Sequence, residues 1–476
     1  MTPDATGATV AIVGGGYSGA AVAFHLARAA PRGLRDIIVF EPRERLGAGL
    51  AYSTDDPSLR VNVPADKLTF QSEHSNDFAD WLRRTGAADD DGEADAGNGA
   101  LYPQRAVFGA YTAACIAPLL STGQVRHRRV AVAKAVRANG KFLLLPKAGQ
   151  PIQADIVVLA TTHPAPRVPA PMRALEGTEK FIADAYAADA LEAIARHDRI
   201  LIVGTGLTSA DVIASLHRRG HDGPIVALSR HGLRSQAHAP NGTSPEQAQT
   251  ANDLAPHRAS ALLRTIRLAV AAAAKRGETW HAVLDDVRKQ GTEIWQALPE
   301  DGRARIVRHL RTYWDIHRFR VAPQLDSIIR RALAEDRLRY RAATLINAER
   351  SPTGLRVHFR PRGSEQAVAQ EFDAVVVTTG PAHSDITRTN GFLRELRDVG
   401  LIVPDKFGLG IAVDQTSRAL SRSGLAQEDL LIAGPLARGT FGELMGVPEV
   451  TLHAEQVAQH IALRIRSGAF NREKVS

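Results

Sequence analysis

The feature that most constrains the fold of this 476-residue chain is a pattern that occurs twice: an apolar strand followed by a glycine-rich turn and a helix. In the first copy, Gly14, Gly16 and Gly19 follow the apolar residues 9–13 and precede an alanine-rich stretch. The second copy has its turn at residues 204–209. In such a turn the first glycine permits a tight bend, the second lets the backbone approach a pyrophosphate, and the third lets helix and strand pack closely. The pattern therefore predicts two dinucleotide-binding units.

Continuous runs of valine, isoleucine and leucine alternate with helical stretches in both copies, which is typical of parallel sheets covered on both faces. We expect an α/β fold with two Rossmann-like, three-layer domains. The first is predicted to be discontinuous and to comprise residues 1–165 and 382–476. The second is predicted at residues 166–381, with a helical insertion at 252–338. The predicted strands are residues 9–13, 36–40, 125–136, 141–146 and 156–160 in the first unit and 199–203, 225–228, 339–348, 355–360 and 374–377 in the second.

The residues that end the second strand of each unit distinguish the two nucleotides. Glu41 stands there in the first unit, and a carboxylate can accept hydrogen bonds from both hydroxyls of an unphosphorylated ribose. Ser229 and Arg230 stand at the same place in the second unit. A hydroxyl and a guanidinium bind a 2′-phosphate, which a carboxylate would repel. The sequence therefore predicts FAD in the first unit and NADPH in the second.

Composition limits the remaining chemistry. Cys115 is the only cysteine, which excludes a redox-active cysteine pair and makes the cytoplasm the expected location. The net charge of +8 comes from 59 basic and 51 acidic residues spread along the chain, so we expect anionic cofactors and no nucleic acid. No leader pattern or membrane-spanning run is found, and no side-chain spacing suggests a metal. A homodimer is one possible oligomeric state.

Two further segments have distinct compositions. Residues 89–99 are acidic and poor in apolar side chains, which predicts a mobile surface loop. Residues 449–465 have the spacing of a last amphipathic helix.

Several segments together resemble the bacterial FAD/NAD(P)-binding protein family, a relative of the class B flavoprotein monooxygenases. These segments are residues 14–19, 47–53, 62–65, 105–111, 204–208, 229–233, 314–320 and 379–381. The resemblance implies that residues 49–52 and 62–65 line the isoalloxazine ring, that Gly434 and Pro435 lie by the ribityl chain, and that Glu449 opens a helix directed toward the ring. Because an inward carboxylate would oppose a reduced, anionic flavin, we expect Glu449 to face outward.

The chain departs from the family pattern at two places. The family has Ala-Thr-Gly after the closing strand of the first unit, whereas this chain has Ala160-Thr161-Thr162-His163. We expect His163 at the hinge between the units rather than against the nicotinamide. The Phe-Gly-His-Trp signature of Baeyer–Villiger enzymes is missing at residues 181–184, which disfavours oxidation of a ketone to an ester.

These expectations favour a cytoplasmic, FAD-dependent and NADPH-consuming oxidoreductase, and within that class a monooxygenase that uses O2 on a small polar substrate, with N-hydroxylation as one option. The alternatives are a flavin-dependent reductase or dehydrogenase without oxygen insertion, and a flavin-bound accessory or sensor protein that docks through the helical insertion. Candidate anion clamps are Arg105, Arg234, His238, Arg318 and Arg320, and the candidate catalytic residues are Asn62, Arg234 and His238. The candidate cofactor-binding residues are Gly14, Gly16, Tyr17, Ser18, Gly19, Glu41, Gly49, Leu50, Asn62, Val63, Arg105, Gly204, Gly206, Leu207, Thr208, Ser209, Ser229, Arg230, Gly380, Gly434, Pro435 and Glu449.

Overall fold

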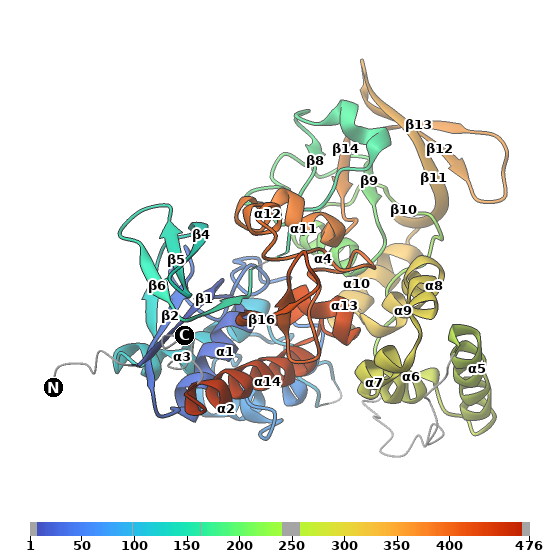
Figure 1. The fold of residues 1–476 in the computed structure, drawn as a ribbon. Coiled ribbons are helices and arrows are strands. Elements are labelled where there is room, and N and C mark those ends of the chain that lie inside the picture. Colours follow the sequence, from blue (N-terminus) through green and yellow to red (C-terminus); the bar gives the residue numbers. More distant parts are fainter. Residues whose placement is uncertain (1–6, 98, 162, 240–257, 469–476) are drawn as a thin grey trace.

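The computed structural model describes residues 7–97, 99–161, 163–239 and 258–468 (Figure 1). Its first sheet has six strands, in the order β15-β16-β7-β1-β2-β3. Strands β16, β7, β1, β2 and β3 run parallel, and the edge strand β15 is antiparallel to β16. Every residue of β1 and β7 is buried, as expected for strands covered on both faces. The strands are β1 (Ala8–Val13), β2 (Leu34–Phe40), β3 (Arg126–Arg128), β7 (Ile156–Leu159), β15 (Arg418–Leu420) and β16 (Ala426–Ile432).

This sheet is the middle one of three layers. Helix α1 (Tyr17–Ala29) packs on β1 and β2 and is flanked by α14 (Val447–Arg466) and α3 (Arg105–Ser121). Strands β6 and β5 of a small antiparallel sheet pack against β1 and β7, and α12 (Gly391–Asp398) contacts the third strand, β4. The small sheet consists of β4 (Val132–Ala138), β5 (Lys141–Pro146) and β6 (Ile152–Ala154). Helix α2 (Asp77–Thr85) packs beside α3.

The second sheet has seven strands, in the order β13-β12-β11-β10-β9-β14-β8. Its parallel part runs from β8 to β11, and β11, β12 and β13 form an antiparallel extension. Helices α4 (Leu207–Arg218) and α10 (Pro323–Ala334) pack together, while η2 (Ala170–Leu175) packs on β11. The strands are β8 (Phe181–Ile182), β9 (Ile200–Val203), β10 (Ile225–Ser229), β11 (Leu338–Ser351), β12 (Gly354–Pro361), β13 (Val368–Phe372) and β14 (Ala374–Val377). The prediction of an α/β fold with two Rossmann-like units is confirmed.

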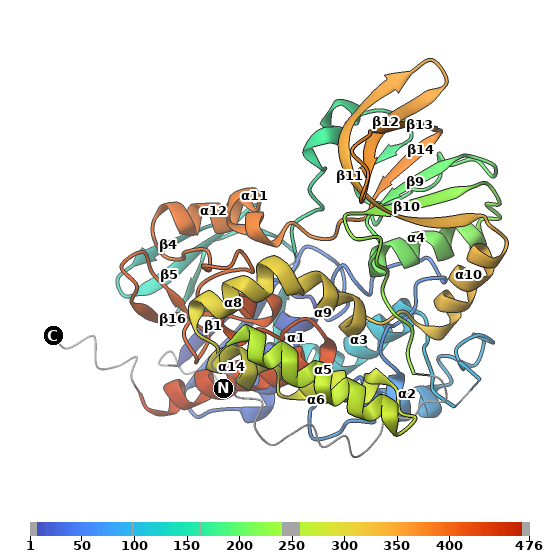
Figure 2. The same ribbon diagram turned by 90° about the vertical axis from the view of Figure 1, so that its right-hand side faces the viewer.

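Helices fill the region between β10 and β11, as the apolar spacing there predicts; residues 252–257 of the predicted insertion lie outside the described residues. This helical layer contacts the first unit, because Trp295 Nε1 donates to the Gly439 carbonyl at 2.9 Å and Trp314 Nε1 donates to Glu443 at 3.1 Å. Figure 2 shows α5, α6, α8 and α9 gathered at one side of the molecule. The elements are α5 (Ala259–Lys275), α6 (Trp280–Lys289), α7 (Gly291–Ala297), α8 (Glu300–Arg305), η4 (Ile306–Leu310) and α9 (Arg311–Arg318).

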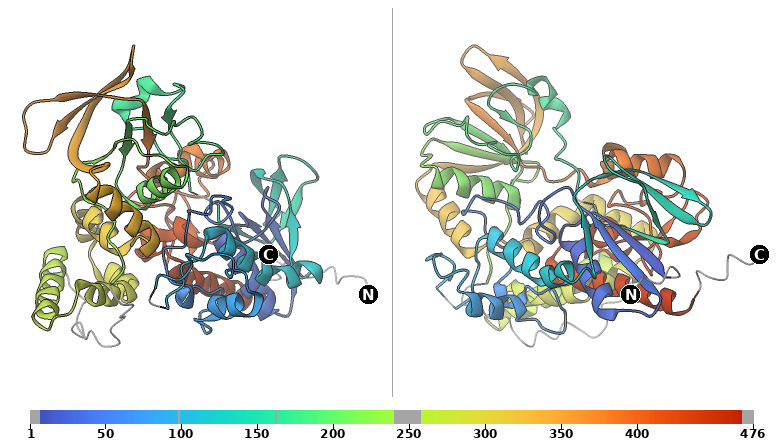
Figure 3. Two further views of the ribbon diagram at one scale, coloured as in Figure 1. Left: turned by 180° about the vertical axis from the view of Figure 1, so that it is seen from behind. Right: turned by 90° about the vertical axis from the view of Figure 1, so that its left-hand side faces the viewer.

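The chain crosses between the two sheets after β7 and returns after β14 (Figure 3). A single antiparallel bridge between Pro166 and Pro381 places the two crossing segments side by side. The predicted domain boundaries at residues 165 and 381 fall beside this bridge, and they remain a prediction. Within the described ranges, none of the helices combines the length and hydropathy that a bilayer crossing requires.

Most described residues of the acidic segment 89–99 are exposed, as expected for a surface loop, and its mobility stays a prediction. Asp91 accepts two hydrogen bonds from the buried guanidinium of Arg60, at 2.7 and 2.8 Å, and Ala94 is buried. Gln324 of α10 also donates to the Glu93 carbonyl at 2.7 Å. Composition alone missed this anchoring because it depends on partners distant in sequence.

Candidate functional site

A groove of about 550 Å³ opens at the carboxyl end of the first sheet, where the turn between β1 and α1 meets the segments after β2 and β7. This is the edge where open α/β sheets bind their ligands. Eight of the predicted cofactor residues line it, namely Gly14, Gly16, Tyr17, Ser18, Glu41, Gly49, Leu50 and Pro435.

The turn itself has the geometry that a pyrophosphate requires. Gly14 has φ +103°, and a Cβ there would overlap the Ala160 carbonyl oxygen. The N-cap of α1 is Gly16, which supplies no side-chain cap, and the first helical turn carries no acidic residue. The first N–H groups of α1 are therefore free to bind an anion, and the helix dipole favours one there.

On the opposite wall of the groove, the backbone of Gly49 lies close to the backbone of this turn. A Cβ at Gly49, which has φ +54°, would lie 3.0 Å from Gly16 Cα, so the two backbones approach closely and a side chain at Gly49 would press on the turn. Arg43 and Lys147 add two cations to the groove. Buried Glu41 accepts hydrogen bonds from the N–H groups of Gly15 and Arg43, at 3.0 and 3.1 Å, which holds its carboxylate in the groove wall. A dinucleotide with an unphosphorylated ribose fits these residues.

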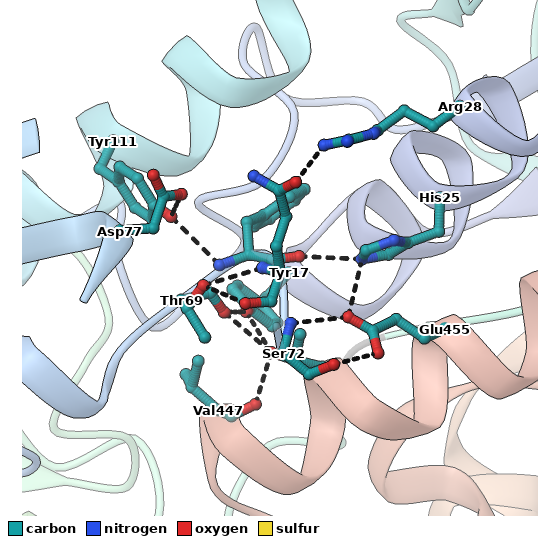
Figure 4. A network of polar contacts seen from close by, with 12 residues as sticks. Tyr17, His25, Arg28, Thr69, Ser72, Asp77, Tyr111, Val447 and Glu455 are labelled. Carbon is teal, nitrogen blue, oxygen red and sulfur yellow. Dashed lines mark hydrogen bonds and ion pairs between the residues drawn. The ribbon is translucent and has the colours of Figure 1, made fainter. Parts of the chain in front are cut away.

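Tyr17 contributes to this site through its backbone position and its packing, while its hydroxyl is used inside the protein (Figure 4). The hydroxyl donates to the Thr69 carbonyl at 2.6 Å and lies 2.6 Å from Thr451 Oγ1. Burial raises the pKa of this phenol well above its usual value. In the same network His25 Nε2 lies 2.8 Å from the Phe70 carbonyl oxygen. The network joins α1, the segment after residue 68 and α14, and so fixes the start of α1 beside the groove.

The second turn repeats the first with one change. Gly204 has φ +118°, and α4 begins at N-cap Gly206 without a side-chain cap and without an acid in its first turn. Ser209 stands where the first turn has Gly19, and it is fully buried. A side chain at this position needs room between α4 and its strand that a glycine does not need.

The predicted phosphate-binding residues lie at the end of β10, beside this turn. Thr205 Oγ1 donates to Ser229 Oγ at 2.9 Å, and Ser229 Oγ accepts from the Gly232 N–H at 3.0 Å. Arg230 is exposed and makes no ion pair within the described part of the chain. Its guanidinium is therefore available to an external anion.

The three predicted catalytic residues are only partly brought together. His238 Nε2 lies 2.9 Å from the Asn62 carbonyl oxygen, and burial lowers the pKa of His238 to about 4. Asn62 Oδ1 is buried without a hydrogen-bond partner among the described residues. Arg234 instead forms an ion pair with Asp326 of α10, 2.9 Å between Nη1 and Oδ1. The catalytic assignment of all three remains a prediction.

The assignment of Arg105 as a cofactor ligand stays a prediction, and the contacts that the structure shows for it lie within the protein. Its Nη2 donates to both carboxylate oxygens of Asp211 in α4, at 3.0 and 2.8 Å, and its Nε donates to the Arg60 carbonyl. Tyr186 also bonds to Asp211. Asp211 raises the pKa of Arg105 even though burial opposes it. The guanidinium of Arg105 thus forms an ion pair that links the two units. The residue type and position of Arg105 in the sequence do not reveal this pairing.

Glu449 does not face outward as the sequence suggested. It pairs with Arg288 of the helical layer through hydrogen bonds of 2.7 and 2.9 Å, and Arg318 lies 3.5 Å away. Against the effect of burial, these cations lower the pKa of Glu449. Its charge is therefore neutralised within the protein. Arg318 and Arg320, both predicted clamps, are also paired, with Glu443 and Asp285 respectively.

The other predicted residues shape the site without lining the groove. A Cβ at Gly434, which has φ +72°, would overlap the side chain of Ser18, so this glycine lets its segment rest on the start of α1. Gly380 has φ +76° and lies in the crossing segment after β14. Val63 is partly buried against the core. Several residues that line the groove were not predicted from the sequence. Arg43 could have been found from its place two residues after Glu41. Lys147 and residues 390–392 belong to no sequence motif that would predict their place in the groove.

His163 lines the groove and also stands at the hinge. Its ring contacts that of His383 from the returning segment, with 4.6 Å between centroids. Burial lowers the pKa of His163 to about 4 and that of His383 to about 2, the latter also through His163, Arg438 and Arg311. Both imidazoles are therefore neutral at physiological pH. Within the described ranges no group of three His, Cys, Asp or Glu side chains could hold a metal ion.

Two family models match the chain, and they overlap. Residues 11–164 match a family described as FAD-NAD(P)-binding, and residues 101–276 match the L-lysine 6-monooxygenase/L-ornithine 5-monooxygenase family. No curated protein sequence is significantly similar to the chain.

Solved structures share the fold over nearly the whole length. The L-lysine 6-monooxygenase from Pseudomonas syringae is 18% identical with a TM-score of 0.66, and the match covers 96% of this chain and 99% of that one. The ornithine N-hydroxylase from Kutzneria sp. 744 is 18% identical with a TM-score of 0.64, covering 96% and 99%. The cadaverine monooxygenase of desferrioxamine biosynthesis from Erwinia amylovora is 12% identical with a TM-score of 0.63, covering 97% and 94%. Residues 11–164 of this chain are therefore similar to FAD/NAD(P)-binding proteins and residues 101–276 to the lysine and ornithine monooxygenases, and the chain shares its fold with solved monooxygenase structures.

Proposed function

We propose that this protein is a FAD-dependent, NADPH-consuming monooxygenase that hydroxylates a nitrogen of a small amine. The observation that carries the proposal is the pair of uncapped, acid-free helix starts, at α1 and α4, in a chain whose residues 101–276 match the lysine/ornithine monooxygenase family. The structures with this fold include a Kutzneria ornithine N-hydroxylase holding reduced FAD, NADP⁺ and L-ornithine, and a cadaverine monooxygenase holding FAD.

The protein's own groups have defined tasks in this reaction. FAD and NADPH supply the hydride and the activation of O2 when they are bound. The starts of α1 and α4 bind the two pyrophosphates, Glu41 binds the adenosine ribose of FAD, and Arg230 binds the 2′-phosphate of NADPH. His163 in the groove wall stays uncharged at neutral pH and leaves the groove without a competing cation at the hinge. Asn62 Oδ1 is buried without a hydrogen-bond partner among the described residues and would be satisfied by a ligand group that reached it.

A thiol-dependent reductase is the alternative that the structure argues against most directly. Burial raises the pKa of Cys115 to about 12, so this sole cysteine stays protonated and unreactive. A reductase that passes hydride from NADPH to a free acceptor, and an accessory flavoprotein, stay as competing functions. The predicted cytoplasmic location and homodimer also stay predictions.

Product analysis with the holoenzyme separates these functions. NADPH consumption, hydroxylamine product and hydrogen peroxide are measured together for ornithine, lysine, cadaverine and other small amines. The proposal expects that one amine accelerates NADPH oxidation and yields a matching amount of hydroxylamine. A reductase would consume NADPH without hydroxylamine for every amine, and an accessory protein would not be reduced by NADPH.

Charge reversal at Arg230 tests the nucleotide preference. An Arg230→Glu variant loses a charge-assisted hydrogen bond of about 1.5–3 kcal/mol to the 2′-phosphate, so we expect KM for NADPH to rise roughly 10- to 150-fold. KM for NADH should change little, since NADH has no 2′-phosphate. Arg219→Glu, an equal charge change at an exposed position after α4, is the control. An equal loss for both nucleotides would reject the assignment.

A further inference from the structure

A second cavity, of about 640 Å³, lies between the helical layer and residues 438–443 of the first unit and is separate from the dinucleotide groove. Its volume is in the range of small-molecule sites. Helix α5 closes one side with Leu262, Ile266 and Val270, which follow one another at helical spacing. Trp280, Trp295 and Trp314 line the other sides, so three of the four tryptophans of the chain meet here. The wall is therefore mostly aliphatic and aromatic.

One end of this cavity is cationic. Arg438 lines it and is only 6% exposed. Its Nε donates to the Gly442 carbonyl at 3.2 Å, and its Nη2 lies 3.9 Å from Asp315 Oδ1, a long distance for a buried ion pair. Arg311 lines the same end, with its Nε 3.3 Å from Asp315. Two guanidinium groups thus share one carboxylate.

The second carboxylate at this end, that of Glu443, already has hydrogen-bond donors within the protein. Glu443 accepts hydrogen bonds from Trp314 Nε1 and from Arg318, whose guanidinium is buried. Burial, and then the proximity of Arg311, lower the pKa of Arg438, which shows that its charge is poorly compensated. A buried cation in this state gains most from an anionic partner.

We propose that this cavity binds an amphiphilic organic anion, a carboxylate with a medium-length hydrocarbon chain, with the carboxylate at Arg438 and Arg311 and the chain along the inner face of α5. An inorganic anion would make no contact with the apolar wall. A small polar amine carries a positive charge and hydrogen-bond donors, and it would be repelled by the two guanidinium groups. This inference does not depend on the reaction proposed above, because it concerns binding in a different cavity.

The site lies next to the flavin groove. Pro435 lines the groove and Arg438 lines the cavity, so η6 (Gly434–Ala437) and the start of α13 (Arg438–Phe441) separate the two spaces. His383 connects them electrostatically, since its pKa is lowered by His163 on the groove side and by Arg438 on the cavity side.

Calorimetric titration of the FAD-loaded protein with hexanoate, octanoate and decanoate tests this proposal. Because each buried methylene contributes about 0.8 kcal/mol, affinity should rise about fourfold per added carbon. Decan-1-ol, which has the same chain without the charge, should bind at least about tenfold more weakly than decanoate. An absence of saturable binding, or equal affinity for decanoate and decan-1-ol, would overturn the proposal.

Paired variants locate the binding. Ile266→Trp fills the cavity from its α5 wall and should weaken decanoate binding at least about tenfold, whereas Leu268→Trp, on the exposed side of the same helix, should leave it within about twofold. Arg438→Gln should remove the preference for decanoate over decan-1-ol, and Arg264→Gln on the outer side of α5 should keep it. Arg311→Gln gives the same test if Arg438→Gln does not fold. Unchanged binding in Ile266→Trp would place the ligand elsewhere and refute the site.

Discussion

Replacement of Gly19 by alanine will largely remove FAD from the purified protein. A Cβ on Gly19 would overlap the carbonyl oxygen of Gly14 and lie 3.2 Å from Ile12 Cγ2. Gly14 has little room to move away, because it has φ +103° and a Cβ built on it would overlap the Ala160 carbonyl oxygen. Helix α1 must therefore shift outward, which withdraws the N–H groups that bind the pyrophosphate. Overpacking of this kind costs about 1–3 kcal/mol, so affinity for FAD should fall roughly 5- to 150-fold.

A change at the second glycine of the other turn provides the control. Gly206→Ala places a Cβ where no atom of the described residues lies within 4 Å, at a residue whose φ of −87° any amino acid adopts. This variant should keep its full flavin content. Flavin absorbance per protein and FAD titration of the apoprotein measure the effect, and far-UV circular dichroism reports whether the fold persists. A Gly19→Ala protein that retains stoichiometric flavin would show that α1 does not position the pyrophosphate as we infer.

The same comparison explains why so much of the nucleotide-binding frame could be predicted from sequence. The two turns and the residues after the second strands are local features, because a strand, its turn and the following helix are contiguous in the chain. Glu41 and Ser229 therefore fall at corresponding sheet edges in the structure, as their spacing required. The Ser209 departure at the third turn position was likewise readable, since a side chain there needs room between helix and strand.

The parts that could not be predicted depend on partners far apart in the chain. Arg105 and Asp211 are 106 residues apart, and Arg288 and Glu449 are 161 apart, so no periodicity relates them. Arg105 is a predicted anion clamp, yet in the structure it pairs with a carboxylate from another element. The apolar cavity was also invisible, because the spacing of Leu262 and Ile266 predicts a buried helix face equally well whether protein or ligand covers it.

Truncation of Arg105 to methionine should be among the most destabilising single substitutions in this protein. The side chain of Asp211 would keep its buried position between the two units while losing both hydrogen bonds from Arg105. Removal of one partner of a buried ion pair costs about 3–5 kcal/mol, because the remaining charge is uncompensated. Denaturant unfolding, followed through separate probes for flavin and for tryptophan, measures this loss. The flavin probe should report it as well, since the pair joins α3 of the FAD unit to α4 of the NADPH unit.

Two companion variants separate this effect from a general loss of packing. Arg196→Met breaks an exposed ion pair with Asp222 and should cost no more than about 1 kcal/mol. The double variant Arg105→Met/Asp211→Leu removes both charges and should recover much of the stability lost by the single variant. A double variant as unstable as Arg105→Met would mean that lost packing, and not the orphaned carboxylate, causes the destabilisation.

The pH dependence gives the sharpest form of this test. Burial raises the pKa of Asp211, and Arg105 opposes that rise. Without Arg105 the folded-state pKa must rise further above its unfolded value, so the folded variant takes up a proton at a pH where the original protein still holds an ionised Asp211. A raised folded-state pKa stabilises the folded form below that pKa and loses this contribution as the pH increases through it. The stability gap between the original protein and Arg105→Met should therefore be largest at neutral and alkaline pH and should narrow on acidification. A gap that stays constant from pH 8 to the acid limit of folding, roughly pH 5, would show that Asp211 does not carry the uncompensated charge.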